Sequence, residues 1–160
     1  MAFASNAFSQ QFEYEIKTNW KFQQEGKNEW NNATVPGVVH LDLLENEIIE
    51  DPYWENNELK LRWIENENWI YQTTFIVDDS VLKFNQQELI FNGLDTYATV
   101  YLNGKEILQA ENMFREWKVD AKQFIKQGDN ELKVVFQSPI KYNKKKVKKY
   151  PYQLPSGNES

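Results

Sequence analysis

Carboxylates are the side chains in this sequence with the most obvious capacity for chemistry. Glu58, Glu65 and Glu67 lie close together, and two carboxyl groups at the right separation can act as general acid and general base. The chain contains 24 Asp and Glu residues, however, so neighbouring carboxylates arise by chance, and charged side chains are mostly solvated. We therefore interpret these three glutamates as solvent-exposed residues rather than as a catalytic pair.

Histidine and cysteine chemistry is limited by composition. The sequence has one histidine, His40, and no cysteine. A zinc site built from histidine and thiolate ligands needs more of both, and no serine or cysteine partner that would make His40 a catalytic base is evident. We predict that His40 is a hydrogen-bonded structural residue, and that the chain carries neither a metal site nor a cofactor.

Charge is distributed unevenly along the chain. The net charge is −6, from 18 Lys and Arg against 24 Asp and Glu. Six of the basic residues lie in the segment 141–149, KYNKKKVKK, so the remainder carries a balance of −12. An acidic body repels phosphates, which argues against a nucleic-acid partner. We interpret the lysine run as a solvated linker or a lysine-protected edge strand rather than as a phosphate-binding patch.

Length and composition indicate one globular domain of ordinary size. The 160 residues are 41% hydrophobic and 26% charged, and a chain of this length can bury a core without disulfides. No apolar run approaches the roughly 20 residues that span a membrane. The opening MAFASNAFSQ lacks the basic and apolar regions of a signal peptide. We therefore predict no membrane partner.

Alternation of apolar and polar residues predicts a domain of short strands. Asn103-Gly104 separates two alternating runs, and Asn-Gly is the strongest short-range signal for a tight hairpin. The run 97–102 places its odd-numbered residues on one face and its even-numbered residues on the other. Both faces are partly apolar, so either one could be the buried face. The earlier pair Asn92-Gly93 is interpreted as a looser corner.

Further elements are expected on both sides of this hairpin. Additional strands are predicted within segments 12–26, 69–77, 88–93, 105–110, 115–120 and 131–140. Short helical turns are expected near His40–Glu45, within 55–63, and within AKQFIKQGDN (121–130), where the turn would end in a Gly-Asp-Asn loop. Repeated short strands with polar turns indicate an all-β sandwich or jelly roll.

Several segments, in order, resemble the amino-terminal domain of β-mannosidases in glycoside hydrolase family 2. The longest is VPGVVHLDLLENEIIEDPYWENNELKLRWIENENWIYQTTF, residues 35–75. Its recognisable parts are Val35–His40, Asp51-Pro52-Tyr53, Asn57-Glu58, Arg62-Trp63-Ile64 and Asn68-Trp69. GLDTYATVYLNG (93–104) and AENMFREWKVD (110–120) resemble the same domain's central hairpin and the strand that follows it. The resemblance covers roughly Trp20 to Pro139.

The resemblance implies a jelly-roll, galactose-binding-like β-sandwich with one or two short helices. In the family, an immunoglobulin-like domain and a TIM barrel follow, and the barrel carries the two catalytic glutamates of a retaining glycosidase. A chain of 160 residues cannot contain a barrel of about 250 residues. No catalytic residue is therefore expected here, and the isolated chain is expected to be inactive. The analogy also places the parent enzyme in the periplasm or outside the cell.

The expected organisation has three parts. Residues 1–19 form a lead-in with the first strand, residues 20–140 form the sandwich, and residues 141–160 form a lysine-rich exit toward the downstream domains. The C-terminus reads as cut rather than finished, because YQLPSGN (152–158) resembles the lead-in to a sugar-pocket segment of the family.

The candidate site is the loop 51–63, which faces the barrel in the family. The resemblance implies that six residues border the sugar pocket: Asp51, Tyr53, Asn57, Glu58, Arg62 and Trp63. An aromatic ring and hydrogen-bonding side chains suit a sugar. A structural interpretation stays open, in which Arg62 pairs with Glu58 or Asp51 and fixes the loop while Trp63 lies in the core. Trp54 has no assigned role.

Three functions remain open. The chain could be an accessory domain of a β-mannosidase that packs on the barrel and shapes a pocket for terminal β-D-mannosides. It could be a stand-alone carbohydrate-binding module, as jelly rolls often are. It could also be a protein-interaction domain that uses the lysine run. We favour the first, because a self-sufficient module should end after its last strand.

Overall fold

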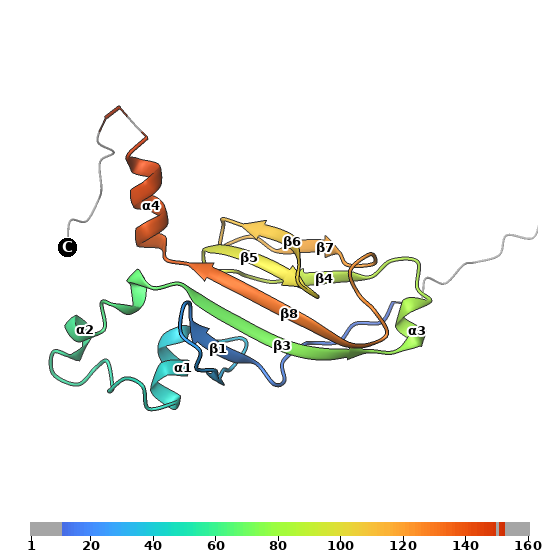
Figure 1. The fold of residues 1–160 in the computed structure, drawn as a ribbon, viewed down its shortest axis with the longest axis horizontal. Helices are drawn as coiled ribbons and strands as arrows, with labels where there is room; N and C mark the ends of the chain where they lie inside the picture. The colour runs from blue at the N-terminus through green and yellow to red at the C-terminus, as the bar shows by residue number, and fades with distance from the viewer. Residues whose placement is uncertain (1–10, 150, 153–160) are drawn as a thin grey trace, which may run out of the picture.

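The computed structural model describes residues 11–149 and 151–152, and these form a two-layered β-sandwich (Figure 1). One layer is a six-stranded sheet in the order β2-β1-β3-β8-β5-β6, and the other is the two-stranded sheet β4-β7. The strands are β1 (Lys21–Gln24), β2 (Asn31–Asn32), β3 (Trp69–Val77), β4 (Glu88–Phe91), β5 (Tyr97–Leu102), β6 (Lys105–Ala110), β7 (Trp117–Asp120) and β8 (Gly128–Gln137). All neighbouring strands run antiparallel, so the predicted fold class is confirmed.

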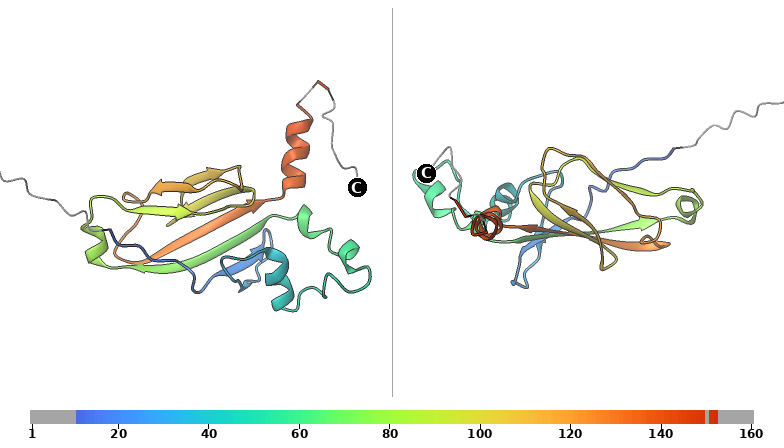
Figure 2. Two further views of the ribbon diagram at one scale, coloured as in Figure 1. Left: turned by 180° about the vertical axis from the view of Figure 1, so that it is seen from behind. Right: turned by 90° about the horizontal axis from the view of Figure 1, so that it is seen from above.

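The long central pair β3–β8 organises the core between the two layers (Figure 2). Its register runs from Trp69 opposite Phe136 to Val77 opposite Gly128. Alternate residues of β3 are buried, beginning with Trp69 and ending with Val77. The strand thus lays one apolar side chain after another onto the core, where Leu89, Phe91 and Trp117 of the small sheet pack from the opposite layer.

The predicted hairpin is present and joins β5 to β6. Asn103 and Gly104 both have positive φ, at 51° and 78°, which is the backbone that a two-residue type I′ turn requires. The even-numbered residues of β5 are the buried ones, with Val100 and Leu102 fully enclosed. Asn92-Gly93 makes no hairpin, because β4 pairs with β7 and not with β5, so the looser corner is confirmed.

The amino-terminal strand prediction was wrong for residues 12–19. Phe12, Tyr14 and Ile16 alternate in sequence, but the ladder begins only at Lys21, which lies opposite Gln72. Phe12 is 65% exposed. Alternation indicates a strand only where a neighbouring strand is available for pairing, and along residues 12–19 the described chain offers none.

The Gly-Asp-Asn loop prediction was also wrong, because Gly128 opens strand β8. Asn130 lies opposite Phe75 in the ladder with β3 and is fully buried. Its Nδ2 donates to the carbonyls of Lys126 and Gly128, and its Oδ1 accepts from the Lys126 amide and from Asn103 Nδ2. The side chain thereby closes the turn before β8 and ties it to the hairpin.

Five short helices lie between or after the strands. They are α1 (Val39–Glu45), α2 (Asn57–Lys60), the 3-10 turn η1 (Ile64–Asn66), α3 (Asp79–Leu82) and α4 (Pro139–Val147). The helix predicted near His40–Glu45 is confirmed as α1, and the helical turn expected within 55–63 is α2. Residues 122–124 form a turn and not a helix.

The lysine run is helix α4, so the prediction of a linker or an edge strand was wrong. Ser138 accepts a hydrogen bond from the amide of Lys141 and Pro139 opens the helix, which is a strong start signal. Ser138 Oγ donates to the carbonyl of Glu65 at 2.5 Å. Tyr142 stacks on Tyr97 of β5 with ring centroids 3.8 Å apart. These contacts hold α4 against the sandwich.

Candidate functional site

The candidate site lies on the entry loop, which we define as residues 46–68 between α1 and β3. Trp69, where β3 begins, lies opposite Phe136, near the end of β8. The entry loop and the start of α4 therefore share one end of the sandwich, and α3 lies at the other (Figure 1). Long connections in compact domains are frequently functional.

Polar side chains, rather than an apolar core, shape the entry loop. Asp51 Oδ1 accepts from the amide of Tyr53 at 2.9 Å, a local turn that Asp favours. The buried Asn57 donates to the carbonyl of Asp51 at 3.0 Å and accepts from Lys60 Nζ at 2.9 Å. Lys60 also lies 3.7 Å from a carboxylate oxygen of Glu50. Asn57 is thus the residue that ties the two arms of the loop together.

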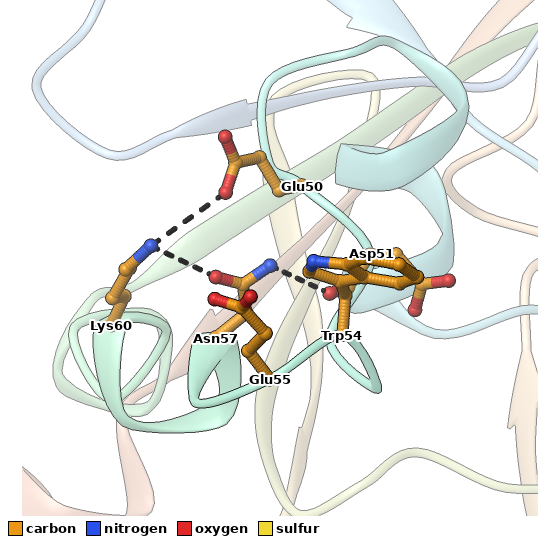
Figure 3. A pocket seen from close by; sticks show the side chains of 6 residues that line it. All are labelled: Glu50, Asp51, Trp54, Glu55, Asn57 and Lys60. Carbon is orange, nitrogen blue, oxygen red and sulfur yellow. Dashed lines mark hydrogen bonds and ion pairs between the residues drawn. The ribbon is translucent and has the colours of Figure 1, made fainter.

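These contacts leave a hollow of about 280 Å³ at the surface, lined by Glu50, Asp51, Trp54, Glu55, Asn57 and Lys60 (Figure 3). We call it the loop hollow. Carboxylates supply acceptors, the Lys60 ammonium supplies donors, and the indole of Trp54, 68% exposed, supplies an aromatic face. Such a set suits a ligand with hydroxyl groups and a C–H face. The volume is near the lower end of the range of small-molecule sites, roughly 300–1,000 Å³.

The structure brings two of the six candidate residues into the loop hollow. Asp51 and Asn57 line it. Tyr53 is 96% exposed and, like Glu58 and Arg62, lies outside the lining.

The structural interpretation of the loop was wrong in its details. Among the described residues, no ion pair joins Arg62 to Glu58 or Asp51, and Arg62 instead contributes its carbonyl, which accepts from Asn66 Nδ2. Trp63 is 37% exposed and lies beside Trp69 with ring centroids 5.9 Å apart. Asn57 and Lys60 therefore do the work that was expected of Arg62.

Four lining residues were missed from the sequence. They are Glu50, Trp54, Glu55 and Lys60. Trp54 carried a usable signal, because an aromatic residue outside any alternating run is a poor candidate for the core. Glu50 and Lys60 carried none, since only the turn held by Asn57 brings their side chains together.

The other candidate chemical residues have bland environments. Glu58 and Glu65 are exposed, and Glu67 lies 3.5 Å from Lys141 Nζ, which agrees with the solvated interpretation. His40 is exposed on α1. Its side chain makes no hydrogen bond to any residue that the structure describes, so the prediction of a hydrogen-bonded role was wrong.

One buried ionisable pair lies behind α1. The Tyr71 hydroxyl donates to Asp42 Oδ2 at 2.6 Å, and the amide of Thr34 donates to Asp42 Oδ1 at 2.8 Å. Burial raises the pKa of Tyr71 strongly, and the hydrogen bond to Asp42 raises it further. Asp42 on α1 and Tyr71 on β3 thereby fasten the helix to the sheet. The sequence gave no sign of this pair, because only the fold brings the two residues together.

Metal and membrane features were also examined over residues 11–149 and 151–152. No group of three or more His, Cys, Asp or Glu side chains could hold a metal ion there. In the same part of the chain, no helix is both long and apolar enough to cross a membrane.

The sandwich defines the class of domain, and comparison with known proteins defines the family. Residues 20–160 match the family model described as glycosyl hydrolase 2 galactose-binding domain-like. The chain belongs to this family.

Its relatives include β-mannosidases. A β-mannosidase from Capra hircus is 36% identical over 141 residues, which are 88% of this chain and 16% of that protein. The β-mannosidase B of Thermothelomyces thermophilus is 37% identical over 139 residues, or 85% of this chain and 16% of that protein. The chain thus spans about a sixth of the length of the curated relatives it matches.

Solved structures give the same relationship. The β-D-mannosidase of Dictyoglomus thermophilum superposes with a TM-score of 0.88 at 42% identity, over 91% of this chain and 18% of that one. The exo-chitosanase CsxA of Amycolatopsis orientalis shares the fold, with a TM-score of 0.65 at 18% identity, over 74% of this chain and 16% of that one. The predicted resemblance to β-mannosidase amino-terminal domains is confirmed.

Proposed function

We propose that this chain serves as the non-catalytic amino-terminal domain of a β-mannosidase-type glycoside hydrolase that acts on terminal β-D-mannosides with retention. The observation that carries the proposal is the match to β-mannosidases along almost the whole chain. That match reaches 42% identity and a TM-score of 0.88 with the Dictyoglomus thermophilum enzyme. The low share of each relative that is covered supports a role as one part of a larger enzyme.

In this proposal, the domain packs on a catalytic barrel and the loop hollow borders the barrel's sugar pocket. The immunoglobulin-like domain and the barrel are its partners within one polypeptide. The exposure of Tyr53 and Trp54 supports a contact at this end of the sandwich. Helix α4 leaves the sandwich at the same end (Figure 1), so it can lead the chain toward those partners.

The loop hollow is poorly suited to hold a sugar by itself. Association costs several kcal/mol of lost freedom, and each hydrogen bond contributes only about 0.5–1.5 kcal/mol net. A shallow hollow with one aromatic ring supplies few such contacts. This favours a shared pocket over an independent sugar-binding module.

The test is a chimera in which this chain replaces the matched segment of the Dictyoglomus thermophilum β-D-mannosidase. We expect the isolated chain to show no turnover of an aryl β-mannoside, because it has no paired catalytic carboxylates. We expect the chimera to hydrolyse it within about tenfold of the parent kcat/KM, a loss of about 1.4 kcal/mol of transition-state stabilisation.

A matched control chimera carries the CsxA domain, which has the same fold at only 18% identity, and is expected to have far lower activity. A chimera with this chain that unfolds cooperatively near the parent Tm, yet has no turnover, would overturn the proposal. Turnover by the isolated chain that depends on one of its own carboxylates would also contradict it.

A further inference from the structure

A second hollow lies on the six-stranded sheet, away from the entry loop. It has a volume of about 370 Å³ and is lined by Asn19, Lys21, Trp30, Gln72, Thr73 and Thr74. We call it the Trp30 hollow. Thr74 follows Trp69 by five residues on β3, so at about 3.3 Å per residue it lies roughly 17 Å along the strand from the entry loop. The two hollows are therefore separate sites.

Local backbone chemistry builds the Trp30 hollow. Asn19 has a φ of 58°, a left-handed conformation that Asn tolerates better than most residues. The bend there brings Lys21 opposite Gln72 at the start of β1. Trp30 directly precedes the edge strand β2, and its indole is 38% exposed. An aromatic wall thus lies at the edge of a sheet that presents polar side chains.

The polar groups around this hollow are largely unpaired. Within the part of the chain that the structure describes, the side chains of Asn19, Lys21, Trp30 and Thr74 make no hydrogen bond and no ion pair. Gln72 donates through Nε2 to Glu131 at 3.0 Å. An amide, a hydroxyl, an ammonium and an indole N–H therefore surround one aromatic ring and remain available to a ligand.

This set of groups matches a pyranose ring. A hexose presents a C–H face to an aromatic ring and hydroxyl groups to both donors and acceptors, whereas a flat apolar ligand would leave four polar side chains unused. A carboxylated sugar is less suited, because Lys21 is the one cation in the lining and the body of the protein is acidic. The chemistry favours a neutral hexopyranose.

We propose that the Trp30 hollow is a surface site for a hexose unit of a neutral oligosaccharide, distinct from the loop hollow. The choice of a β-linked manno-oligosaccharide as the ligand rests on the proposed function. A single aromatic platform with a few polar contacts gives weak binding, so the dissociation constant is expected in the low millimolar range. The site would hold a longer substrate chain near the enzyme.

The test is NMR titration of the 160-residue chain with β-1,4-mannohexaose. We expect the indole N–H signal of Trp30, assigned with Trp30→Phe, to move and approach saturation by about 10 mM sugar, the concentration scale of weak affinities. Signals of the entry loop should stay in place. In Trp30→Ala the shifts should fall at least fivefold, and Thr74→Arg, which fills the hollow, should weaken binding similarly.

Trp54→Ala is the matched control, since it removes an exposed tryptophan from the loop hollow and should leave these shifts unchanged. An indole signal of Trp30 that does not move at about 10 mM sugar would refute the site. So would shifts that survive both Trp30→Ala and Thr74→Arg, or that disappear with Trp54→Ala. None of these outcomes bears on turnover by the chimera, so failure here is distinguishable from failure of the proposed function.

Discussion

Asn130→Ala is expected to lower the free energy of unfolding by about 3 kcal/mol, because each buried group left unpaired costs about 1–3 kcal/mol. The substitution removes four hydrogen bonds made by a fully buried amide. It also frees Asn103, whose Nδ2 otherwise bonds both Asn130 and the carbonyl of Phe124. The turn before β8 and the β5–β6 hairpin should therefore loosen together.

Urea denaturation of the isolated chain measures this change through the transition midpoint. Asn85→Ala is the matched control, since Asn85 is exposed and surface substitutions usually stay within about 0.5 kcal/mol. If Asn130→Ala changed stability no more than the control, the interpretation of the buried amide as the clamp of this turn would be wrong.

Asp42→Ala is expected to cost about 2–4 kcal/mol, because it leaves the Tyr71 hydroxyl and the Thr34 amide buried without their partner. Tyr71→Phe should cost less, since the Asp42 carboxylate keeps its bond from Thr34. In a double-mutant cycle, the two substitutions should be non-additive by at least about 0.5 kcal/mol, because the residues are in contact. Additive effects would show that the pair does not couple α1 to β3.

The same pair predicts a dependence on pH. The pKa of Tyr71 is raised in the folded state, so its contribution is fully present below the ordinary tyrosine pKa of about 10 and is lost as pH rises above it. The stability difference between the wild type and Tyr71→Phe should therefore shrink between about pH 9 and pH 11. A difference that stays constant over this range would contradict the raised pKa.

Features determined by local chemistry were predictable from the sequence. The Asn103-Gly104 hairpin was found because its turn needs two residues with positive φ, and the pair supplies them. Helix α4 was missed because its lysines suggested a solvated segment, although Ser138-Pro139 is a helix start that can be read locally. The start signal should have outweighed the charge.

Features determined by tertiary contacts were not predictable. The alternation of Phe12 and Tyr14 indicated a strand, yet it has no partner strand along those residues. Asn57 was placed at the site, but its function as the tie between Asp51 and Lys60 depends on a turn that only the folded loop forms. Trp54 could have been found, because its position outside any strand left it without a core to join.

The central claim is that the loop hollow borders the sugar pocket of a β-mannosidase, and the kcat/KM of Trp54→Ala in the chimera tests it most directly. The exposed Trp54 is not needed for folding, so Tm should stay unchanged, and Asp79→Ala on α3, at the far end of the sandwich, serves as control. We predict that Trp54→Ala lowers kcat/KM for an aryl β-mannoside at least about tenfold, equal to about 1.4 kcal/mol. A kcat/KM that stays with that of Asp79→Ala would contradict the claim.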